Sequence, residues 1–264
     1  MERRYETLEI EVHDPKITVV IMNRPQALNA MNTKMMEELR DVFQEFYLSP
    51  SDANCIILTG KGDRGFCSGA DLKERDGMSD QTWKRQHAIV EQFIRNMFAC
   101  PVPIIAAVNG VAFGGGFEIA LAADFIYASE TARFALPEVT RGIMPGAAGP
   151  QNLPRACGVR RAKELVLTGQ AFDAAKAFEW GIANRVCAAD KLLDETIATA
   201  RMIAQNAPIG VRQAKKSLDK ATELDRNSGY AFEIEAYNSV VSTEDRLEGI
   251  RAFNEKRKPV FKGQ

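Results

Sequence analysis

Two glutamates lie in stretches of the sequence that are otherwise apolar. Glu118 lies within FEIALAAD, and Glu138 follows 20 residues later in ALPEV. Charged side chains are rarely buried without a partner or a task, so both are candidates for catalysis. Two carboxylates in apolar surroundings can differ in pKa and so divide general acid and general base work. An ion pair with Arg133 or Arg141 is the alternative for Glu138, and spacing alone does not show that the glutamates meet.

Two Gly-rich segments each follow an apolar stretch that predicts a buried strand. GFCSGADLKER (65–75) follows CIILTG, and NGVAFGGGFEIA (109–120) follows PIIAAV. Glycines let the backbone turn sharply and approach a ligand, and the first amides of a helix are unpaired at its positive end. One N–H from each loop would hold a thioester oxygen, and losing such a donor costs about 100- to 1000-fold in rate. The alternative for the three glycines is close packing of a helix on a sheet.

Several other chemistries lack their usual residues. The only histidines, His13 and His87, have no metal-type spacing to another ligand, and neither flanks a Gly-rich turn. The sequence contains no GxSxG, GxxxxGK[ST] or GxGxxG motif. An odd number of cysteines without a CxxC pair argues against zinc and disulfides and favours reduced thiols in a cytoplasmic protein. These cysteines are Cys55, Cys67, Cys100, Cys157 and Cys187.

The composition is that of an ordinary globular protein. The 264 residues include 34 Lys and Arg and 35 Asp and Glu, for a formal net charge of −1. Bulk charge therefore gives no support for a nucleic-acid or membrane partner. Residues 1–14 have no apolar run behind their basic residues, so we expect no secretory signal. No apolar segment is long enough to span a bilayer.

The pattern of apolar residues predicts an α/β core followed by a helical region. We expect helices over 33–47, capped by Asn32 or Thr33, and over 80–99, and a short buried helix within 114–124. From Gly158 onward the sequence is mostly helical, with breaks at Gly181 and Pro208. The predicted strands are 5–13, 17–22, 55–60, 103–110, 124–129 and 132–136.

Taken together, the motifs resemble the crotonase superfamily and, within it, the enoyl-CoA hydratases. The resemblance covers nearly the whole chain and rests on several motifs in the family's order. They are NRPQALNAMN (23–32), FCSGADLKE, NGVAFGGGFEIALAAD, ALPEVTRGIMPGAAG and TEDRLEGIRAFNEKRKPVFKG (243–263). It implies an α/β fold, a crotonase-like spiral of repeated ββα units. Residues 1–200 would form the core and residues 201–264 a helical region that assembles homotrimers or hexamers.

The resemblance also implies roles for residues of the site. The backbone N–H groups of Ala70 and Gly115 match the two oxyanion donors. Glu118 and Glu138 match the catalytic glutamates that position and activate one water, and Gly146 matches a glycine whose N–H helps to hold that water. Because the chain keeps both acids, hydration is favoured over isomerase, hydrolase or decarboxylase chemistry. Neither a metal nor a cofactor is implied, since coenzyme A is part of the substrate.

Other matched segments concern coenzyme A. Ala27-Leu28 and the run Ala70-Asp71-Leu72-Lys73 resemble segments that line the coenzyme. Tyr237, Phe253 and Lys256 match contacts that often come from a neighbouring subunit in the family. From composition alone, the lysines and arginine of 256–262 would be a solvated basic tail.

The chain departs from the family pattern at a few positions. Gln26 replaces a lysine common near the coenzyme, so one phosphate contact is expected to be lost. Ala148 and Pro150 replace Gly and Thr; proline suits the first turn of a helix, so we expect the fold to survive while acyl-chain specificity changes. Arg141 is a candidate to face an acidic acyl tail, although a surface or Glu-paired arginine is favoured.

The leading hypothesis is a trans-2-enoyl-CoA hydratase that yields a 3-hydroxyacyl-CoA. The alternatives within the superfamily are an enoyl-CoA isomerase, a methylglutaconyl-CoA hydratase, which ADLKER also resembles, and a CoA-thioester hydrolase. Outside it remain a non-catalytic CoA-ester or RNA-binding protein and a structural subunit. RNA binding is disfavoured because the predicted helix over 33–47 has no basic stripe.

Overall fold

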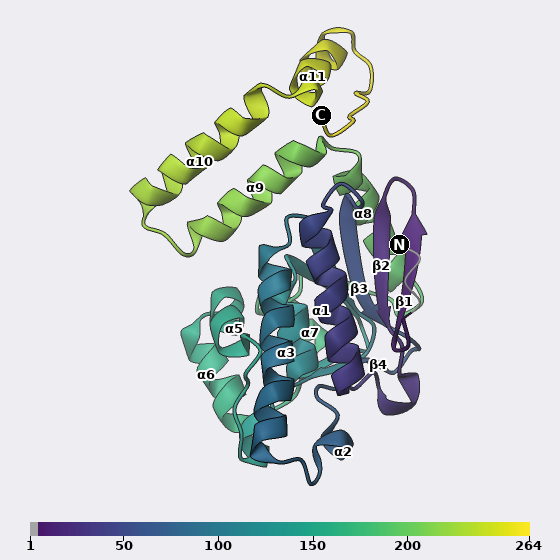
Figure 1. Cartoon of the computed structure of the whole chain (residues 1–264), viewed down its shortest axis with the longest axis vertical. Helices are drawn as coiled ribbons and strands as arrows, with labels where there is room; N and C mark the ends of the chain where they lie inside the picture. Colours follow the sequence, from purple (N-terminus) through teal and green to yellow (C-terminus); the bar gives the residue numbers. More distant parts are fainter. Residues whose placement is uncertain (1–4) are drawn as a thin grey trace.

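The larger of the two sheets has six strands, and its first strands lie at the right of the view in Figure 1. The computed structural model describes residues 5–264. The first two strands form an antiparallel hairpin, and every other neighbouring pair in this sheet is parallel. In sheet order the strands are β1 (Leu8–His13), β2 (Ile17–Met22), β3 (Cys55–Gly60), β5 (Ile104–Val108), β7 (Phe125–Ser129) and β10 (Arg185–Cys187). All but β10 lie within or overlap predicted strands.

A second, smaller sheet contains four short strands. In sheet order these are β4 (Gly65–Cys67), β6 (Val111–Phe113), β8 (Arg133–Ala135) and β9 (Phe172–Asp173). The pairs β4–β6 and β6–β8 are parallel, and β9 runs antiparallel to β8. Each Gly-rich segment that we predicted to be a loop therefore contains a strand. Three residues are too few to show the two-residue alternation by which a strand is recognised in sequence.

Two long helices pack together against the core. They are α1 (Thr33–Leu48) and α3 (Asp80–Ala99), and their bounds agree with the prediction to within one residue. Asn32 caps α1 as predicted, because its side chain accepts a hydrogen bond of 3.0 Å from the amide of Met35. Phe43 of α1 and Phe93 of α3 are fully buried and lie 5.6 Å apart between ring centroids. Two shorter helices each begin at a glycine. Helix α4 (Gly115–Ala122) lies within the predicted range 114–124, and α5 (Gly149–Cys157) begins at the last glycine of PGAAG.

The C-terminal part is helical, as predicted, apart from β9 and β10. Its helices are α6 (Val159–Thr168), α7 (Ala174–Glu179), α8 (Leu192–Ala204), α9 (Pro208–Ala221), α10 (Arg226–Val241) and α11 (Glu244–Asn254). The breaks predicted at Gly181 and Pro208 fall just after α7 and at the start of α9. Figure 1 shows α9 and α10 side by side, extending away from the sheets, with α11 beyond them.

The core and the projecting helices differ in burial. Helix α8 packs on β2, β3 and β5, whereas α9 has no buried residue and α10 has only Ala236. The division into residues 1–200 and 201–264 stays a prediction. No helix among residues 5–264 has the length and hydropathy needed to cross a membrane. Residues 1–4, which begin the segment examined for a secretory signal, lie outside the described residues.

Candidate active site

Three neighbouring parallel strands bring the predicted site residues together. Strands β4, β6 and β8 lie side by side, so their carboxyl ends meet at one edge of the small sheet. Gly69 and Ala70 follow β4, Gly114 and Gly115 follow β6, and Glu138 follows β8. This edge opens into a cavity of about 640 Å³ that these residues line together with Glu118 and Gly146.

The amides of Ala70 and Gly115 face the cavity from two turns in contact. Gly69 has a φ of +99°, and a Cβ there would lie 2.9 Å from the carbonyl oxygen of Phe113 and 3.4 Å from the nitrogen of Gly115. Within residues 5–264 neither the Ala70 nor the Gly115 N–H has an acceptor. Gly115 begins α4, where the unpaired amides carry partial positive charge. The two donors are thus free to bind an anionic oxygen in the cavity.

The glycine triplet also serves packing, as the alternative interpretation proposed. A Cβ at Gly116 would overlap the carbonyl oxygen of Cys67, so only glycine lets α4 approach β4 this closely. The two interpretations therefore apply to neighbouring residues. Gly115 lines the cavity, and Gly116 packs against the strand behind it.

Glu118 lies three residues after Gly115 in α4, so both residues lie on the same helix face. Its side chain is buried, and Oε1 accepts hydrogen bonds of 2.8 Å from the amides of Ala147 and Gly149. Burial raises the pKa of Glu118 to about 7, opposed by the amides of Gly149, Ala147 and Gly146 and reinforced by the charge of Glu138. Gly149 is the first residue of α5, so the carboxylate lies at the positive end of that helix.

The Glu138 carboxylate has fewer hydrogen-bond partners than that of Glu118. Glu138 begins the 3-10 turn η2 (Glu138–Arg141), and its Oε2 is buried without a hydrogen-bond partner among the described residues. Burial raises the pKa of Glu138, opposed by its own backbone amide and by the charge of Arg141. No ion pair joins Glu138 to Arg133 or Arg141 within residues 5–264, which argues against the ion-pair alternative. Its Oε2 is therefore a buried acceptor without a hydrogen bond among the described residues.

His87 was missed by the sequence reasoning as a residue of this site. It projects from α3, lines the cavity, and stands so close to Gly146 that a Cβ on that glycine would lie 2.8 Å from Cε1 of His87. Trp83, His87 and Val90 all line the cavity at positions i, i+4 and i+7 of α3. That spacing marks one helix face and was visible in the sequence, although nothing there indicated what the face meets.

The two segments predicted to line coenzyme A lie against each other. Ala27 and Leu28 end the 3-10 turn η1 (Pro25–Ala27), and the amide of Ser68 donates to the carbonyl of Leu28 at 3.0 Å. Asp71 pairs with Arg24 at 2.9 Å and caps α2 (Leu72–Arg75), so its side chain holds the turn after Ala70. Leu72 lines the cavity, and Lys73 is exposed to solvent.

Comparison with known proteins places this geometry in a family. The model of the enoyl-CoA hydratase/isomerase family matches residues 13–264. The chain belongs to this family. It is 41% identical over 252 residues to the putative enoyl-CoA hydratase/isomerase YngF of Bacillus subtilis, over 96% of each chain. It is also 41% identical over 256 residues to human enoyl-CoA hydratase domain-containing protein 2, mitochondrial, over 95% of this chain and 87% of that protein. It is 38% identical to the short-chain-enoyl-CoA hydratase of Clostridium acetobutylicum, over 92% of this chain and 93% of that protein.

Solved structures support the same assignment. The crystal structure of an enoyl-CoA hydratase from Bacillus anthracis superposes with a TM-score of 0.96 at 39% identity, covering 98% of this chain and all of that one. This enoyl-CoA hydratase/isomerase family member therefore has the crotonase fold, as the motifs predicted. Family and fold do not by themselves distinguish hydration from isomerisation, and the roles of the individual residues stay predictions.

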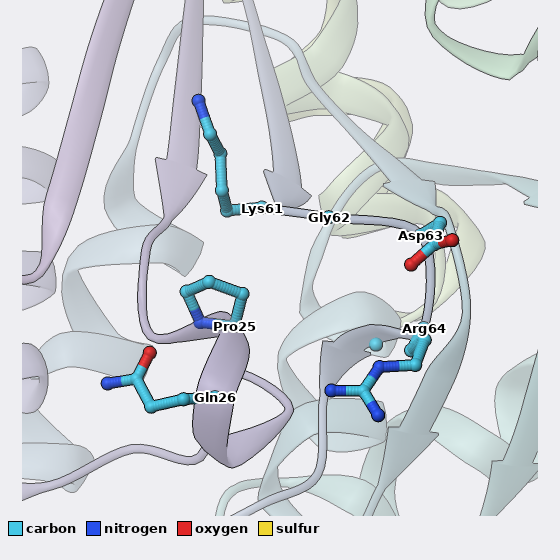
Figure 2. A pocket seen from close by; sticks show the side chains of 7 residues that line it. Pro25, Gln26, Lys61, Gly62, Asp63 and Arg64 are labelled. Atoms are coloured by element: carbon cyan, nitrogen blue, oxygen red, sulfur yellow. The ribbon is translucent and has the colours of Figure 1, made fainter.

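A second pocket adjoins the Ala27–Leu28 turn of this family member. It has a volume of about 220 Å³ and lies between Pro25 and Gln26 on one side and the loop from Lys61 to Gly65 on the other (Figure 2). Lys61 forms an ion pair of 2.6 Å with Glu9, whereas Arg64 is exposed and has no acidic partner within residues 5–264. A cation thus lies across this pocket from Gln26, the position at which the family pattern led us to expect a lysine.

The predicted C-terminal contacts do not reach the cavity within one chain. Tyr237 lies on α10, Phe253 lies on α11, and Lys256 follows α11. The side chains of Tyr237 and Phe253 are 67% and 82% exposed, and none of the three residues lines either pocket. Their assignment to the coenzyme therefore stays a prediction that requires a neighbouring copy.

Proposed function

We propose that the protein is an enoyl-CoA hydratase that adds water to a trans-2-enoyl-CoA and yields a 3-hydroxyacyl-CoA. One observation carries this proposal. Two buried carboxylates, Glu118 and Glu138, line the same cavity as two amides, those of Ala70 and Gly115, that have no acceptor. Membership in the enoyl-CoA hydratase/isomerase family supports it. Metal or redox chemistry is not part of the proposal.

In this proposal the two amides stabilise the negative charge that develops on the thioester oxygen. The thioester oxygen binds between the N–H groups of Ala70 and Gly115, which become stronger partners as the oxygen gains enolate character. This polarisation makes the β-carbon electrophilic. Because the donors are fixed by the β4 and β6 turns, they need no reorganisation when the charge forms.

The glutamates divide the proton transfers according to their surroundings. Amide hydrogen bonds stabilise the ionised form of Glu118, which suits it to take a proton from the attacking water. The water oxygen bonds to the β-carbon, and the electrons of the double bond move toward the α-carbon. Glu138, whose pKa is raised by burial and whose Oε2 has no hydrogen-bond partner among the described residues, delivers a proton to the α-carbon in this proposal. One water is added, and the next cycle requires a proton to pass from Glu118 to Glu138.

We also propose that the active form is a homo-oligomer. Helices α10 and α11 expose the large apolar or aromatic side chains Ile234, Tyr237, Ile250 and Phe253. Exposed apolar surface of this kind favours burial against a partner. A second copy would cover it and bring Tyr237, Phe253 and Lys256 to a neighbouring coenzyme site. Light scattering should give a trimer or hexamer, and a clean monomer at micromolar concentration would contradict this.

The hydratase proposal is tested by adding the purified protein to crotonyl-CoA. The enoyl-thioester absorbance should fall, and mass spectrometry should show one added water. Glu118→Gln should slow the loss at least about 100-fold, whereas Glu179→Gln, at the exposed end of α7, should not slow it. Loss of absorbance with release of free CoA would instead indicate a hydrolase, and unchanged mass with a shifted double bond would indicate an isomerase.

A further inference from the structure

Basic side chains from three elements line the large cavity. They are Arg75 of α2, Lys84 and His87 of α3, and Arg141 of η2. The carboxylates among the lining residues are Glu118 and Glu138 alone. The cavity therefore contains more cationic side chains than its proposed chemistry uses.

Two of these cations form no ion pair within residues 5–264, although the charge of Arg141 acts on Glu138. The Nη1 atom of Arg141 donates to the neutral oxygens Pro137 O, at 3.2 Å, and Thr140 Oγ1, at 2.9 Å. Lys84 takes part in no ion pair or side-chain hydrogen bond. Arg75 differs, because its Nε donates to Gln86 and its guanidinium stacks 4.3 Å from the ring centroid of Trp83. Arg141 and Lys84 are thus exposed cations at the cavity wall whose charge no ion pair within residues 5–264 neutralises.

Both cations lie on elements that also carry other residues of the proposed active site. Arg141 lies on the same single turn as Glu138, and Lys84 lies on α3 one turn from His87, which contacts the Gly146 loop. The segments assigned to the coenzyme come from η1 and from the turn after β4 instead. An apolar acyl chain would pack on Met36, Val90 and Met144 but would leave both cations without a partner.

Resting on the hydratase function proposed above, we propose that the protein selects trans-2-enoyl thioesters whose acyl tail ends in a carboxylate, which Arg141 and Lys84 bind. A guanidinium binds a carboxylate through paired N–H groups, and an ammonium adds a second charge-assisted hydrogen bond. The substrate class is therefore the enoyl-CoA ester of a dicarboxylic acid. The hydrated product keeps that carboxylate.

The experiment compares substrates of equal shape that differ only in charge. Trans-glutaconyl-CoA carries a terminal carboxylate, and trans-5-methylhex-2-enoyl-CoA carries an uncharged isopropyl group in its place. The ratio of kcat/KM for the acidic to the neutral ester is measured for the wild type and for Arg141→Leu, Arg141→Lys and Lys84→Gln. We expect a ratio above one, lowered about 10- to 100-fold by Arg141→Leu, as for losing a hydrogen bond to a charged group. Arg141→Lys should restore part of it.

A neighbouring residue supplies the matched control. Arg85 is adjacent to Lys84 on α3 and exposed, but it does not line the cavity. Arg85→Gln should leave the ratio unchanged, whereas Lys84→Gln should lower it. If Arg141→Leu and Lys84→Gln weaken both esters equally, these cations bind the coenzyme phosphates and the proposal is overturned. A wild-type preference for the neutral ester would also overturn it.

Binding separates failure of this inference from failure of the hydratase function. Calorimetric titration with glutaryl-CoA and with 5-methylhexanoyl-CoA, the saturated counterparts, needs no turnover. Tighter binding of glutaryl-CoA that is lost in Arg141→Leu would support the carboxylate site even if neither enoyl ester were hydrated. Hydration of both esters with equal efficiency and equal binding would leave the hydratase function standing and reject the carboxylate site.

Discussion

The segments that hold the two glutamates differ in how firmly they fix a carboxylate. Glu118 is 2% exposed, and its Oε1 receives two amide hydrogen bonds from residues 147–149. Glu138 is 9% exposed, and its Oε2 has no partner among the described residues. One carboxylate is therefore held at a helix N-terminus, and the other is held by its turn alone.

This difference shows how one cavity can contain an acid and a base. Burial raises the pKa of both carboxyls. At Glu118 the amides of residues 146, 147 and 149 oppose the shift, and the pKa is still about 7; at Glu138 its own backbone amide and the charge of Arg141 oppose it. Hydrogen bonds to the charged form favour ionisation, and their absence favours the proton. The two segments thus place two identical side chains in unlike hydrogen-bonding surroundings.

The largest effect is expected when either glutamate loses its titratable group. Glu118→Gln and Glu138→Gln should each lower kcat about 100- to 10,000-fold, the usual contribution of general acid–base catalysis. The residual activity of Glu138→Gln should keep a pH dependence near pH 7 from Glu118, and that of Glu118→Gln should lack it. Identical pH–rate profiles for the two variants would remove the distinction between the segments.

A second effect is expected on stability against pH. The pKa of Glu118 is about 7 in the folded protein and ordinarily 4.5, so between these pH values the folded state binds more protons than the unfolded state. The free energy of unfolding should therefore fall as the pH rises across this window and level off above it. At about 1.4 kcal/mol per pKa unit, the fall due to Glu118 is about 3 kcal/mol.

Urea unfolding at pH 5 and pH 8 measures this fall. Glu118→Gln should lose most of it, and the remaining slope should come partly from Glu138, whose pKa is also raised. The free energy of unfolding should depend least on pH in the variant that carries both Glu118→Gln and Glu138→Gln. An unchanged slope in Glu118→Gln would show that burial does not perturb this carboxyl as the geometry indicates.

A third, smaller effect concerns the glycine beside Glu118. A Cβ at Gly149 would lie 2.8 Å from Oε1 of Glu118, so the carboxylate must shift by a few tenths of an ångström. Because a misplacement of about 1 Å can cost about 100-fold, Gly149→Ala should lower kcat about 10-fold. Gly210→Ala is the control, because Gly210 lies in α9 and a Cβ there would be 3.9 Å from its nearest neighbour, the Cβ of Ala207. Wild-type kcat in Gly149→Ala would show that the position of Glu118 is not critical.

The sequence predicted the long elements and the three-residue strand β8, which lies within the predicted strand 132–136, but missed other short strands. Helices α1 and α3 were found because 16 and 20 residues establish their periodicity. Strands β4 and β6, of three residues each, were missed, yet their pairing brings Ala70 and Gly115 together. The identities of the site residues could be predicted from local motifs, whereas their convergence depends on pairing between distant segments.

The same limit explains the residues that the sequence did not reveal. His87 meets Gly146 only because α3 packs beside the loop before α5, and no local pattern encodes that contact. The charge environment of Arg141 likewise depends on which carboxylates lie near it in space. Tyr237, Phe253 and Lys256 lie on a surface whose partner is absent from a single chain, so neither the sequence nor one copy tests them.

The smallest predicted effect concerns the backbone that holds Glu118. Ala148 has φ +71° and ψ +10°, a left-handed conformation that costs a residue with a Cβ about 1 kcal/mol or more. Glycine removes this cost but gains about 0.4 to 1 kcal/mol of conformational freedom in the unfolded chain. Ala148→Gly should therefore raise the free energy of unfolding by only about 0.5 kcal/mol, the small difference between these terms.

Ala156→Gly is the matched control for this measurement, because it lies in the same helix with helical backbone and should lose about 1 kcal/mol. Urea unfolding at pH 8 measures both variants. If the strain is confined to Ala148, the free energy of unfolding should rise in Ala148→Gly and fall in Ala156→Gly. Its neighbours, Ala147 and Gly149, supply the amides that hold Glu118. A loss of stability in Ala148→Gly would mean that the left-handed residue is not strained, and that the amides are positioned by the packing of Ala147 and Gly149 instead.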